Sequence, residues 1–535
     1  METTTDASVP PTDVSDTPGN TAGQAGESGG GSRLSRLRGW FLTPLPYLLA
    51  IAALFRVWSV YTAGGFRAAF LYDDGVYYSA ATALGHGLMP YRDFVLVHPP
   101  GSTVAFAPFG FLAEFTSDST AFALARLAVI CLGVLNTALI YRVAKSVGVF
   151  GATTAALLYA VWFPVVFAER STLLEPFVIL GTVGSLALLF NTKVGGWRPW
   201  VAGILAAIGI STKLWAAIPV LVVLGAVLAA RRFSDALKYV LGIGVAALVI
   251  MLPFFLSAPS NMFNMIVRDQ LGRDRGPMTI MTRFSLIFNM DAFTDGSKGR
   301  TQDAIVLTAI AFVVLAAIAA FVKFKPARVW VVMLAVQIGV LLYVPVFFTG
   351  YPTFAAPALM LVLGAFAQVL WDLAAGGRLQ WVIRGVVAAG VIVGFAFSAV
   401  YITNTPKAFG ALPRAALDAV AGGRCVAADR PSTIAIVNKL TSSLNNDCPI
   451  VVDFTGSYYS TPQARRGMTN RIISPDFQAG IQNYFNNSDY VIITRRSKDQ
   501  MSPQTLDQLK ARPVVFRGKN GHLVIFGPPT PQTAG

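Results

Sequence analysis

From residue 44 to residue 401 the chain alternates between long apolar runs and short polar loops. A membrane-spanning helix needs about 20 mostly apolar residues. The apolar runs predict eleven spans, at 44–62, 120–142, 149–168, 173–192, 199–212, 214–230, 239–257, 303–322, 329–348, 354–371 and 381–401. The pattern is therefore typical of a polytopic α-helical membrane protein.

The number of spans depends on residues 199–230, which are too long for one ordinary span and short for two. A break at Ser211-Thr212-Lys213 gives two short helices and makes every second loop basic. Basic loops stay in the cytoplasm, so this charge pattern favours eleven spans. Arginines that precede the first span, at Arg33, Arg36 and Arg38, then place the N-terminus in the cytoplasm and residues after 401 outside the cell membrane.

Composition agrees with a membrane location. Only 13% of the 535 residues are charged and 54% are hydrophobic, with a mean hydropathy of +0.58. Soluble proteins carry about 25% charged residues. The formal net charge of +15 reports loop topology and contact with anionic membrane lipids. No basic stripe with interleaved aromatic residues is present, so nucleic acid is excluded as a predicted partner.

Outside the spans, the pattern predicts a disordered cytoplasmic tail at 1–40, a membrane domain at 41–402 with a first outer loop at 63–119, and an outer domain at 403–535. In the last region, strand-like runs such as CVAAD, PIVVDF, DYVIITRR, PVVFR and HLVIFG alternate with helix-like runs, which indicates a small α/β domain. Cys425 and Cys448 lie there and predict a disulfide, with two free buried thiols as the alternative.

Polar residues that composition does not explain gather on the predicted outer face. The first outer loop carries Asp73, Asp74, Arg92, Asp93 and His98 between Leu71 and Gly101. Later outer loops add Glu169, Arg170, Glu175, Lys213, Arg268, Gln270, Arg273 and Tyr351. Charges at a membrane boundary are costly unless they are solvated or used. Carboxylates and cations from five loops on one face therefore predict a single active site.

An acidic pair after the first span, followed by YRDF and HPPG, resembles the polyprenyl-phosphate-sugar-dependent glycosyltransferases. These include the protein O-mannosyltransferases and the lipid A aminoarabinose transferases, which share the glycosyltransferase-C fold. The corresponding elements are Asp73-Asp74, Pro99-Pro100, the AERSTLLEP turn and Thr212-Lys213. The turn carries Glu where many relatives have Asp. The resemblance covers roughly residues 40–400 and leaves the C-terminal domain unassigned.

The resemblance implies transfer of a sugar from a polyprenyl-phosphate donor to a glycan, lipid or protein acceptor, with inversion. A carboxylate must accept the proton of the acceptor, and cations must stabilise the leaving phosphate. Asp73 is the first candidate for the base, Asp74 the second and Glu175 the next. The donor phosphate is assigned to Lys213, Arg92, His98, Arg268 and Arg273. Tyr77 shares a helical face with Asp73, and Arg170 is expected to pair with Glu169 and orient Glu175.

Structural alternatives stay open for these residues. One aspartate of the pair can cap a helix. Arg92 and Asp93 can form a simple ion pair, Lys213 can reach the headgroups, and Arg268 and Arg273 can bind lipid phosphates. No Cys/His metal pattern occurs, although the carboxylates would suit Mg or Mn. A transporter or flippase, or a membrane scaffold with an outer binding domain, are the competing functions. Transporters show internal repeats and midplane charges, which this pattern lacks.

Overall fold

The computed structural model describes residues 43–190, 196–273, 275–290, 299–374, 377–404, 410–494 and 499–529. The chain divides into two compact units, Met1–Thr43 and Pro44–Gly535, and everything below concerns the second. The predicted disordered tail at 1–40 lies outside the described residues.

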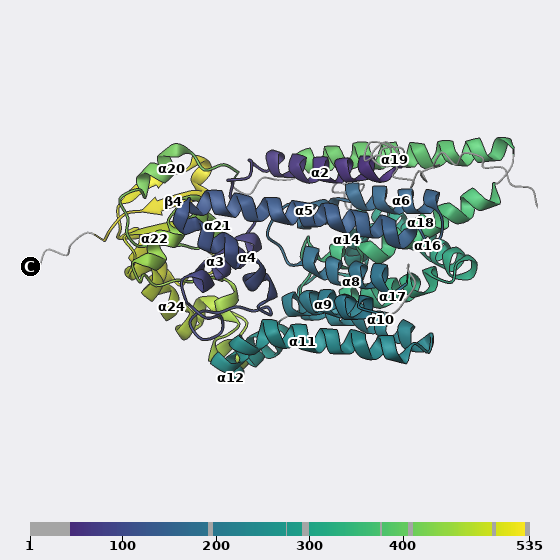
Figure 1. Ribbon diagram of the computed structural model, residues 1–535. Coiled ribbons are helices and arrows are strands. Elements are labelled where there is room, and N and C mark those ends of the chain that lie inside the picture. Colours follow the sequence, from purple (N-terminus) through teal and green to yellow (C-terminus); the bar gives the residue numbers. More distant parts are fainter. Residues whose placement is uncertain are drawn as a thin grey trace, which may run out of the picture. The chain divides into compact units, whose positions relative to one another are not determined.

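Every predicted apolar segment is helical (Figure 1). The segments form α2 (Leu45–Thr62), α5 (Asp118–Ala144), α6 (Val149–Val161) with α7 (Phe163–Ala168), α8 (Glu175–Leu189), α9 (Arg198–Thr212), α10 (Ala217–Ala229), α11 (Phe233–Ser257), α16 (Arg300–Lys323), α17 (Ala327–Tyr343), α18 (Ala356–Leu373) and α19 (Arg378–Asn404). Among the described residues, six of these helices are long and apolar enough to cross a membrane, namely α2, α5, α11, α16, α18 and α19. A helical membrane fold is thus confirmed, while eleven crossings stay a prediction.

The chain reverses direction at Lys213, as the charge pattern predicts. α9 ends at Thr212, and Lys213 is extended, with φ −150° and ψ 121°. α8 and α9 are antiparallel, because the Lys213 ammonium lies 2.7 Å from Glu175 and the Ser185 hydroxyl donates to Ala202 O at 3.1 Å.

α10 then runs back along α8. Arg232, just after α10, donates to Leu189 O at 2.8 Å, at the opposite end of α8 from Glu175. α9 and α10 are therefore antiparallel, and the turn at Lys213 lies at the same helix ends as Glu175. We call these helix ends, where Glu175 and Lys213 lie, the cavity end of the bundle, because they line the cavity described below.

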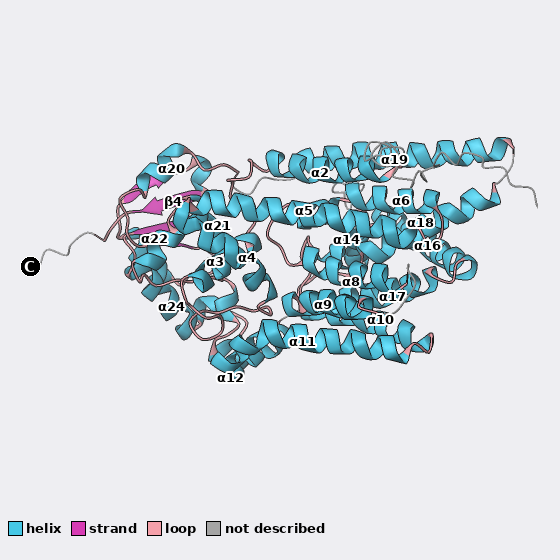
Figure 2. Cartoon of the chain, in the orientation of Figure 1, coloured by secondary structure: helices cyan, strands magenta, loops and turns pink. Residues whose placement is uncertain are grey.

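The C-terminal region forms a four-stranded sheet, the magenta arrows of Figure 2. Its order is β1-β2-β4-β3, with β1 and β2 parallel and the other pairs antiparallel. The strands are β1 (Val426–Ala428), β2 (Tyr490–Thr494), β3 (Val514–Arg517) and β4 (Leu523–Phe526), and the helices around them include α20 (Arg414–Ala419), α21 (Pro431–Ile436), α22 (Leu440–Asn445), α24 (Pro475–Asn486) and α26 (Pro503–Lys510). A mixed sheet with helices between its strands is the α/β arrangement that the sequence predicts.

One predicted strand is wrong. PIVVDF, residues 449–454, forms no strand, because the carboxylate of Asp453 accepts the backbone N–H of Gly456 at 2.8 Å and closes a turn. Val452 and Phe454 are still buried, as a strand would bury them. The apolar alternation therefore reported burial correctly, but the turn replaces the strand.

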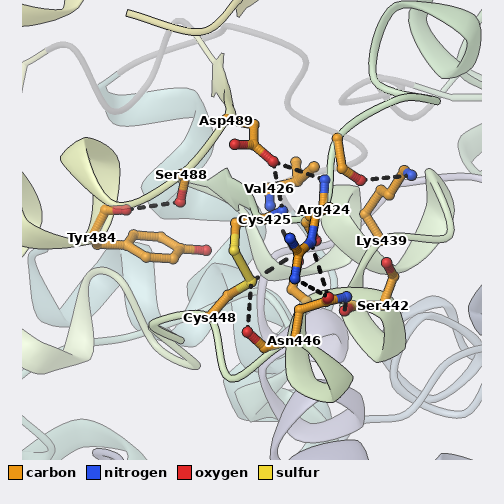
Figure 3. Close-up of a disulfide and its surroundings, with 12 residues drawn as sticks. Arg424, Cys425, Val426, Lys439, Ser442, Asn446, Cys448, Tyr484, Ser488 and Asp489 are labelled. Carbon is orange, nitrogen blue, oxygen red and sulfur yellow. Dashed lines mark hydrogen bonds between the residues drawn. A yellow bond between two sulfur atoms is a disulfide. The ribbon is translucent and has the colours of Figure 1, made fainter.

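Cys425 and Cys448 form the predicted disulfide, with their Cα atoms 5.6 Å apart (Figure 3). Around it, Asp489 accepts the backbone N–H groups of Arg424 and Cys425, and the Arg424 side chain donates to Asn446. The bond therefore ties the start of β1 to the end of α22.

Reduction of this disulfide is expected to destabilise the C-terminal region by about 3 kcal/mol, because a loop of 23 residues loses its constraint in the unfolded chain. Mass spectrometry of unreduced peptides from exported protein should recover the two cysteines linked. Thermal melting with and without reductant measures the size of the effect. Free thiols at both positions would contradict the prediction.

Two polar contacts and one close backbone approach dock the C-terminal region onto the cavity end. The Asp118 carboxylate at the start of α5 accepts the backbone N–H groups of Leu440 and Thr441 at the N-terminus of α22. Asp269, after α12 (Pro259–Phe263), pairs with Arg465 at 2.9 Å. In the first outer loop, α3 (Asp73–Gly85) meets α21 so closely that a side chain on Gly75 would clash with the backbone of Ser432.

Candidate active site

A cavity of about 870 Å³ lies at the cavity end, between the membrane helices and the C-terminal region. Seven residues that the sequence singles out line it together: Asp73, Tyr77, His98, Glu175, Lys213, Arg273 and Tyr351. They come from five separate loops, so the predicted convergence on one place is what the structure contains. The opposite wall comes from the C-terminal region, including Asp429, Arg430, Asp453, Thr455, Tyr459, Asn470, Arg471, Asp499 and Gln500.

The two aspartates of the acidic pair have different surroundings. Both lie in the first turn of α3, where consecutive side chains point about 100° apart. Asp74 is fully buried and accepts hydrogen bonds from Arg126 and Ser171, both at 2.7 Å. Asp73 faces the cavity and accepts no hydrogen bond from any described residue. Asp74 therefore holds the fold, and only Asp73 reaches the cavity, which argues against the prediction of Asp74 as a second base.

The Asp73 carboxyl has an altered acidity. Desolvation by the surrounding protein raises its pKa from 3.8 to about 6, and the negative charges of Asp453, Glu175 and Asp74 add to the shift. Lys213 acts in the opposite direction. A carboxylate whose pKa lies near neutrality holds a proton more firmly than an ordinary aspartate, which is the property that a general base requires.

Lys213 is fixed from three sides. Its ammonium donates to Glu175 Oε1 at 2.7 Å and lies 4.6 Å from the Trp215 ring and 4.4 Å from the Tyr351 ring. The HPPG motif contributes to this arrangement, because a Cβ atom on Gly101 would lie 2.5 Å from the carbonyl oxygen of Ser211. Glycine at the start of α4 (Gly101–Leu112) therefore allows the first outer loop to pack directly on the turn that carries Lys213.

His98 and Arg273 line the cavity near Lys213. Desolvation, together with the charges of Lys213 and Arg273, holds the pKa of His98 well below 6.5. The imidazole is thus neutral, and it can offer one N–H to a ligand but no charge. Its ring packs edge-on against Tyr77, with the centroids 5.8 Å apart. Arg273 lies over the Tyr459 ring at 4.8 Å.

Several predicted residues do not line the cavity. Arg92 pairs with Asp93 at 2.8 Å on the exposed surface, which is the simple ion pair left open above. Arg268 is exposed and absent from the lining, so neither arginine lies where a donor phosphate would bind in this cavity. Gln270 donates to Val97 O at 2.6 Å and so holds the loop segment next to His98.

The expected pairing of Arg170 with Glu169 is wrong. Glu169 is fully buried against Arg56 of α2, whose Nε donates to it at 3.0 Å, and it also accepts from Asn136 and Tyr159. Arg170 instead donates to the Ser59 hydroxyl at 2.9 Å. Adjacent residues at a helix end point apart, so neighbours in sequence are poor partners, and neither side chain orients Glu175 directly.

Sequence reasoning missed the whole C-terminal wall. Asp453 is the clearest example, because it accepts a hydrogen bond from the Tyr72 hydroxyl at 2.9 Å, next to Asp73. The signal was an acidic residue at the end of an apolar run in PIVVDF, but the same pattern ends many ordinary strands. The domain has no recognisable motif, so the sequence alone does not predict that Asp453 contacts the first outer loop.

Within the described ranges, no group of three or more His, Cys, Asp or Glu side chains lies together in an arrangement that could hold a metal ion. We therefore assign no metal ligand. The dependence on Mg or Mn that the sequence left open stays open.

Residues 96–349 match the family model for glycosyltransferase family 87. The match begins in the first outer loop and ends just before Tyr351, and so includes His98, Glu175, Lys213 and Arg273. No curated protein matches the chain significantly.

Solved structures share the fold at low sequence identity. ArnT from Cupriavidus metallidurans in the apo state is 14% identical, with a TM-score of 0.58 over 92% of this chain and 98% of ArnT. The same protein bound to undecaprenyl phosphate gives a TM-score of 0.53 at 14% identity, over 93% and 99% of the two chains. The oligosaccharyltransferase AglB from Archaeoglobus fulgidus, in complex with an inhibitory peptide and a dolichol-phosphate, is 10% identical, with a TM-score of 0.51 over 86% of this chain and 70% of AglB.

These comparisons bear on the functions that the sequence left open. The fold is that of ArnT and AglB along almost the whole chain, and the family model is that of a glycosyltransferase. Neither supports a transporter, a flippase or a non-catalytic scaffold. The chain thus has the fold of these glycosyltransferases, and a little under half of it matches a glycosyltransferase family, which agrees with the resemblance inferred from its acidic pair and HPPG motif.

Proposed function

We propose that this enzyme transfers a sugar from a polyprenyl-phosphate donor to an extracytoplasmic acceptor, with inversion, and that Asp73 is the base. The observation that carries the proposal is the state of Asp73. It is the cavity-facing carboxylate of the acidic pair, it has no hydrogen-bond donor among the described residues, and its pKa is raised to about 6. The neighbours that bind undecaprenyl phosphate and dolichol-phosphate support the class of donor.

The reaction needs a base for the acceptor and cations for the leaving phosphate. Asp73 accepts the proton of the acceptor as the acceptor oxygen attacks the anomeric carbon. The bond from that carbon to the phosphate oxygen breaks, and its electron pair leaves with the polyprenyl phosphate. Fixed cations stabilise the developing charge on that phosphate.

Lys213 and Arg273 are the cations that line the cavity near His98, and we assign the leaving phosphate to them. Glu175 keeps the Lys213 ammonium in place between two rings, so the cation is oriented before the donor binds. A pre-oriented cation loses little side-chain freedom on binding, which favours stabilisation of the transition state.

The donor assignment is tested with membranes that contain the protein. Radiolabelled polyprenyl-phosphate sugars, both hexoses and pentoses, are supplied one at a time, and release of polyprenyl phosphate is measured. One donor should be consumed in wild-type membranes and left intact by the Asp73→Asn variant. If wild-type membranes consume none of them, the donor class is wrong.

The topology is also part of the proposal, with the N-terminus in the cytoplasm and the C-terminal region outside. Lys213 is buried, so exposed positions are better reporters. In a Cys131→Ser background that keeps the disulfide, Lys510→Cys should react with an impermeant maleimide from outside. Ser234→Cys, at the opposite helix ends, should react only after permeabilisation. Labelling of position 234 in intact cells would overturn the orientation.

A further inference from the structure

The C-terminal sheet faces the cavity with the carboxyl ends of its two parallel strands. β1 and β2 are parallel, and the residues just beyond or at their carboxyl ends, Asp429, Arg430 and Thr494, line the cavity. Asp429 joins the two strand ends, because its Oδ2 accepts the backbone N–H of Thr494 at 2.7 Å and its hydroxyl at 2.9 Å. In open α/β sheets, ligands bind outside the carboxyl ends of parallel strands. The strand ends that such domains use for binding therefore line the same cavity as Asp73.

Arg471 is, with Arg430, one of two cations of this wall. Its guanidinium donates to Gln500 Oε1 at 2.9 Å and lies 5.1 Å from the Tyr458 ring. It forms no ion pair with a carboxylate in the part of the chain that the structure describes. Neutral groups thus hold the side chain in position at the cavity, and they include the Tyr459 hydroxyl, which accepts from Arg471 at 3.5 Å. This is the arrangement of a residue that has a donor to offer to a ligand.

The rest of the wall mixes acceptors, donors and an aromatic face. Asp453 and Asp499 supply carboxylates, Asn470 supplies an amide, and Tyr459 supplies a ring. Carbohydrate hydroxyls both donate and accept, so they match such a mixture, and the C–H face of a sugar packs on an aromatic ring. A peptide bound as an added strand would need an open strand edge. No residue within the edge strands β1 or β3 is part of the lining.

We propose that the C-terminal α/β domain is the acceptor-binding domain and that it binds a carbohydrate acceptor against Arg471, Asn470 and Tyr459. The inference rests on the proposed function. In an inverting transfer, the acceptor oxygen approaches the anomeric carbon from the side opposite the leaving phosphate. Lys213 and His98 come from the membrane helices and their first loop. Arg273, the second phosphate cation, lies over the Tyr459 ring where the two walls meet. The acceptor therefore approaches from the side of Arg471 and Asn470. Asp73 lies between the two and takes the proton that the acceptor loses.

Purified full-length protein in lipid nanodiscs tests the proposal by saturation-transfer NMR. The probes are maltotriose, mannotriose and arabinotriose, with a Ser/Thr-containing hexapeptide as the competing class. At least one trisaccharide should bind wild type, and Arg471→Gln should weaken that binding by at least about 10-fold, as expected for a lost hydrogen bond to a charged group. Arg471→Lys keeps the charge but loses the paired N–H donors of the guanidinium, so its affinity should lie between those of wild type and Arg471→Gln.

Arg466→Gln is the matched control, because Arg466 is exposed in the same region and does not line the cavity. It should bind trisaccharide as wild type does. Binding of undecaprenyl phosphate, measured by native mass spectrometry, should be unchanged in all variants and also shows that they are folded. The inference is overturned if no trisaccharide binds, if Arg471→Gln binds as tightly as wild type, or if only the peptide binds. Wild type that fails to bind undecaprenyl phosphate would instead overturn the proposed donor.

Discussion

Replacing Asp73 by asparagine is expected to lower turnover by at least about 100-fold, because general-base contributions run from about 10² to 10⁴-fold. Asparagine keeps the shape of the side chain but cannot accept a proton from the acceptor. Asp73 has no hydrogen-bond donor among the described residues, so the change should leave folding intact. The measurement is the initial rate of polyprenyl-phosphate release at saturating donor, with the yield of folded protein as the reference.

The neighbouring carboxylate supplies the control. Asp74→Asn should act through stability, because it leaves the buried Arg126 without its charge partner. Its rate per folded molecule should therefore fall less than that of Asp73→Asn. If Asp73→Asn and Asp74→Asn both turn over at nearly the wild-type rate, the base lies elsewhere, and Glu175 is the next carboxylate to test.

The raised pKa of Asp73 gives the same assignment a pH signature. A base must be deprotonated to act, so kcat/KM should fall as the pH drops through about 6, the pKa to which desolvation and the nearby carboxylates raise Asp73. Glu175 and Asp453 raise this pKa and Lys213 lowers it. An acid limb near pH 4, typical of a solvated aspartate, would contradict the assignment.

The largest expected loss of stability comes from Arg56→Met. Arg56 and Glu169 are both fully buried among membrane helices and form an ion pair. Removing one partner of a buried pair leaves an uncompensated charge and costs about 3–5 kcal/mol. Little folded protein should survive extraction in detergent, as size-exclusion chromatography of a fluorescent fusion would show.

The double variant Arg56→Met/Glu169→Gln tests the cause. It removes both charges, so it should recover part of the folded yield that Arg56→Met loses, and the difference gives the coupling energy of the pair. Arg142→Met, at the last turn of α5 and in a predicted basic loop, serves as a control for loss of an arginine. A double variant no better than Arg56→Met would mean that packing, and not charge, explains the loss.

Hydrophobic periodicity and loop charge were enough to predict the helices, because each apolar run must be helical to satisfy its backbone within a membrane. The break at Lys213 could be predicted from the same charges, although the run itself is continuous. The convergence of Asp73, Glu175 and Lys213 could be predicted because successive loops lie on alternate faces of the membrane. This assigns each loop to one face without any knowledge of packing.

Contacts between distant parts of the chain could not be predicted in this way. Asp73 and Asp74 are equivalent in sequence, and only the position of Arg126, 52 residues away, decides which of them is buried. Glu169 pairs with Arg56 at a separation of 113 residues, and not with its neighbour. The C-terminal wall was invisible for the same reason, since periodicity reports which face is buried but not what covers it.

The hydrogen bond between Tyr72 and Asp453 joins residues separated by 381 positions in the chain. The residues of the first wall precede those of the C-terminal wall in the chain, so the first wall is synthesised before the second. During synthesis, a chain that carries Asp73 and Lys213 but not yet residues 429–500 lacks the C-terminal wall of the cavity. The cavity therefore closes only after its C-terminal wall has been made and has docked on the first outer loop.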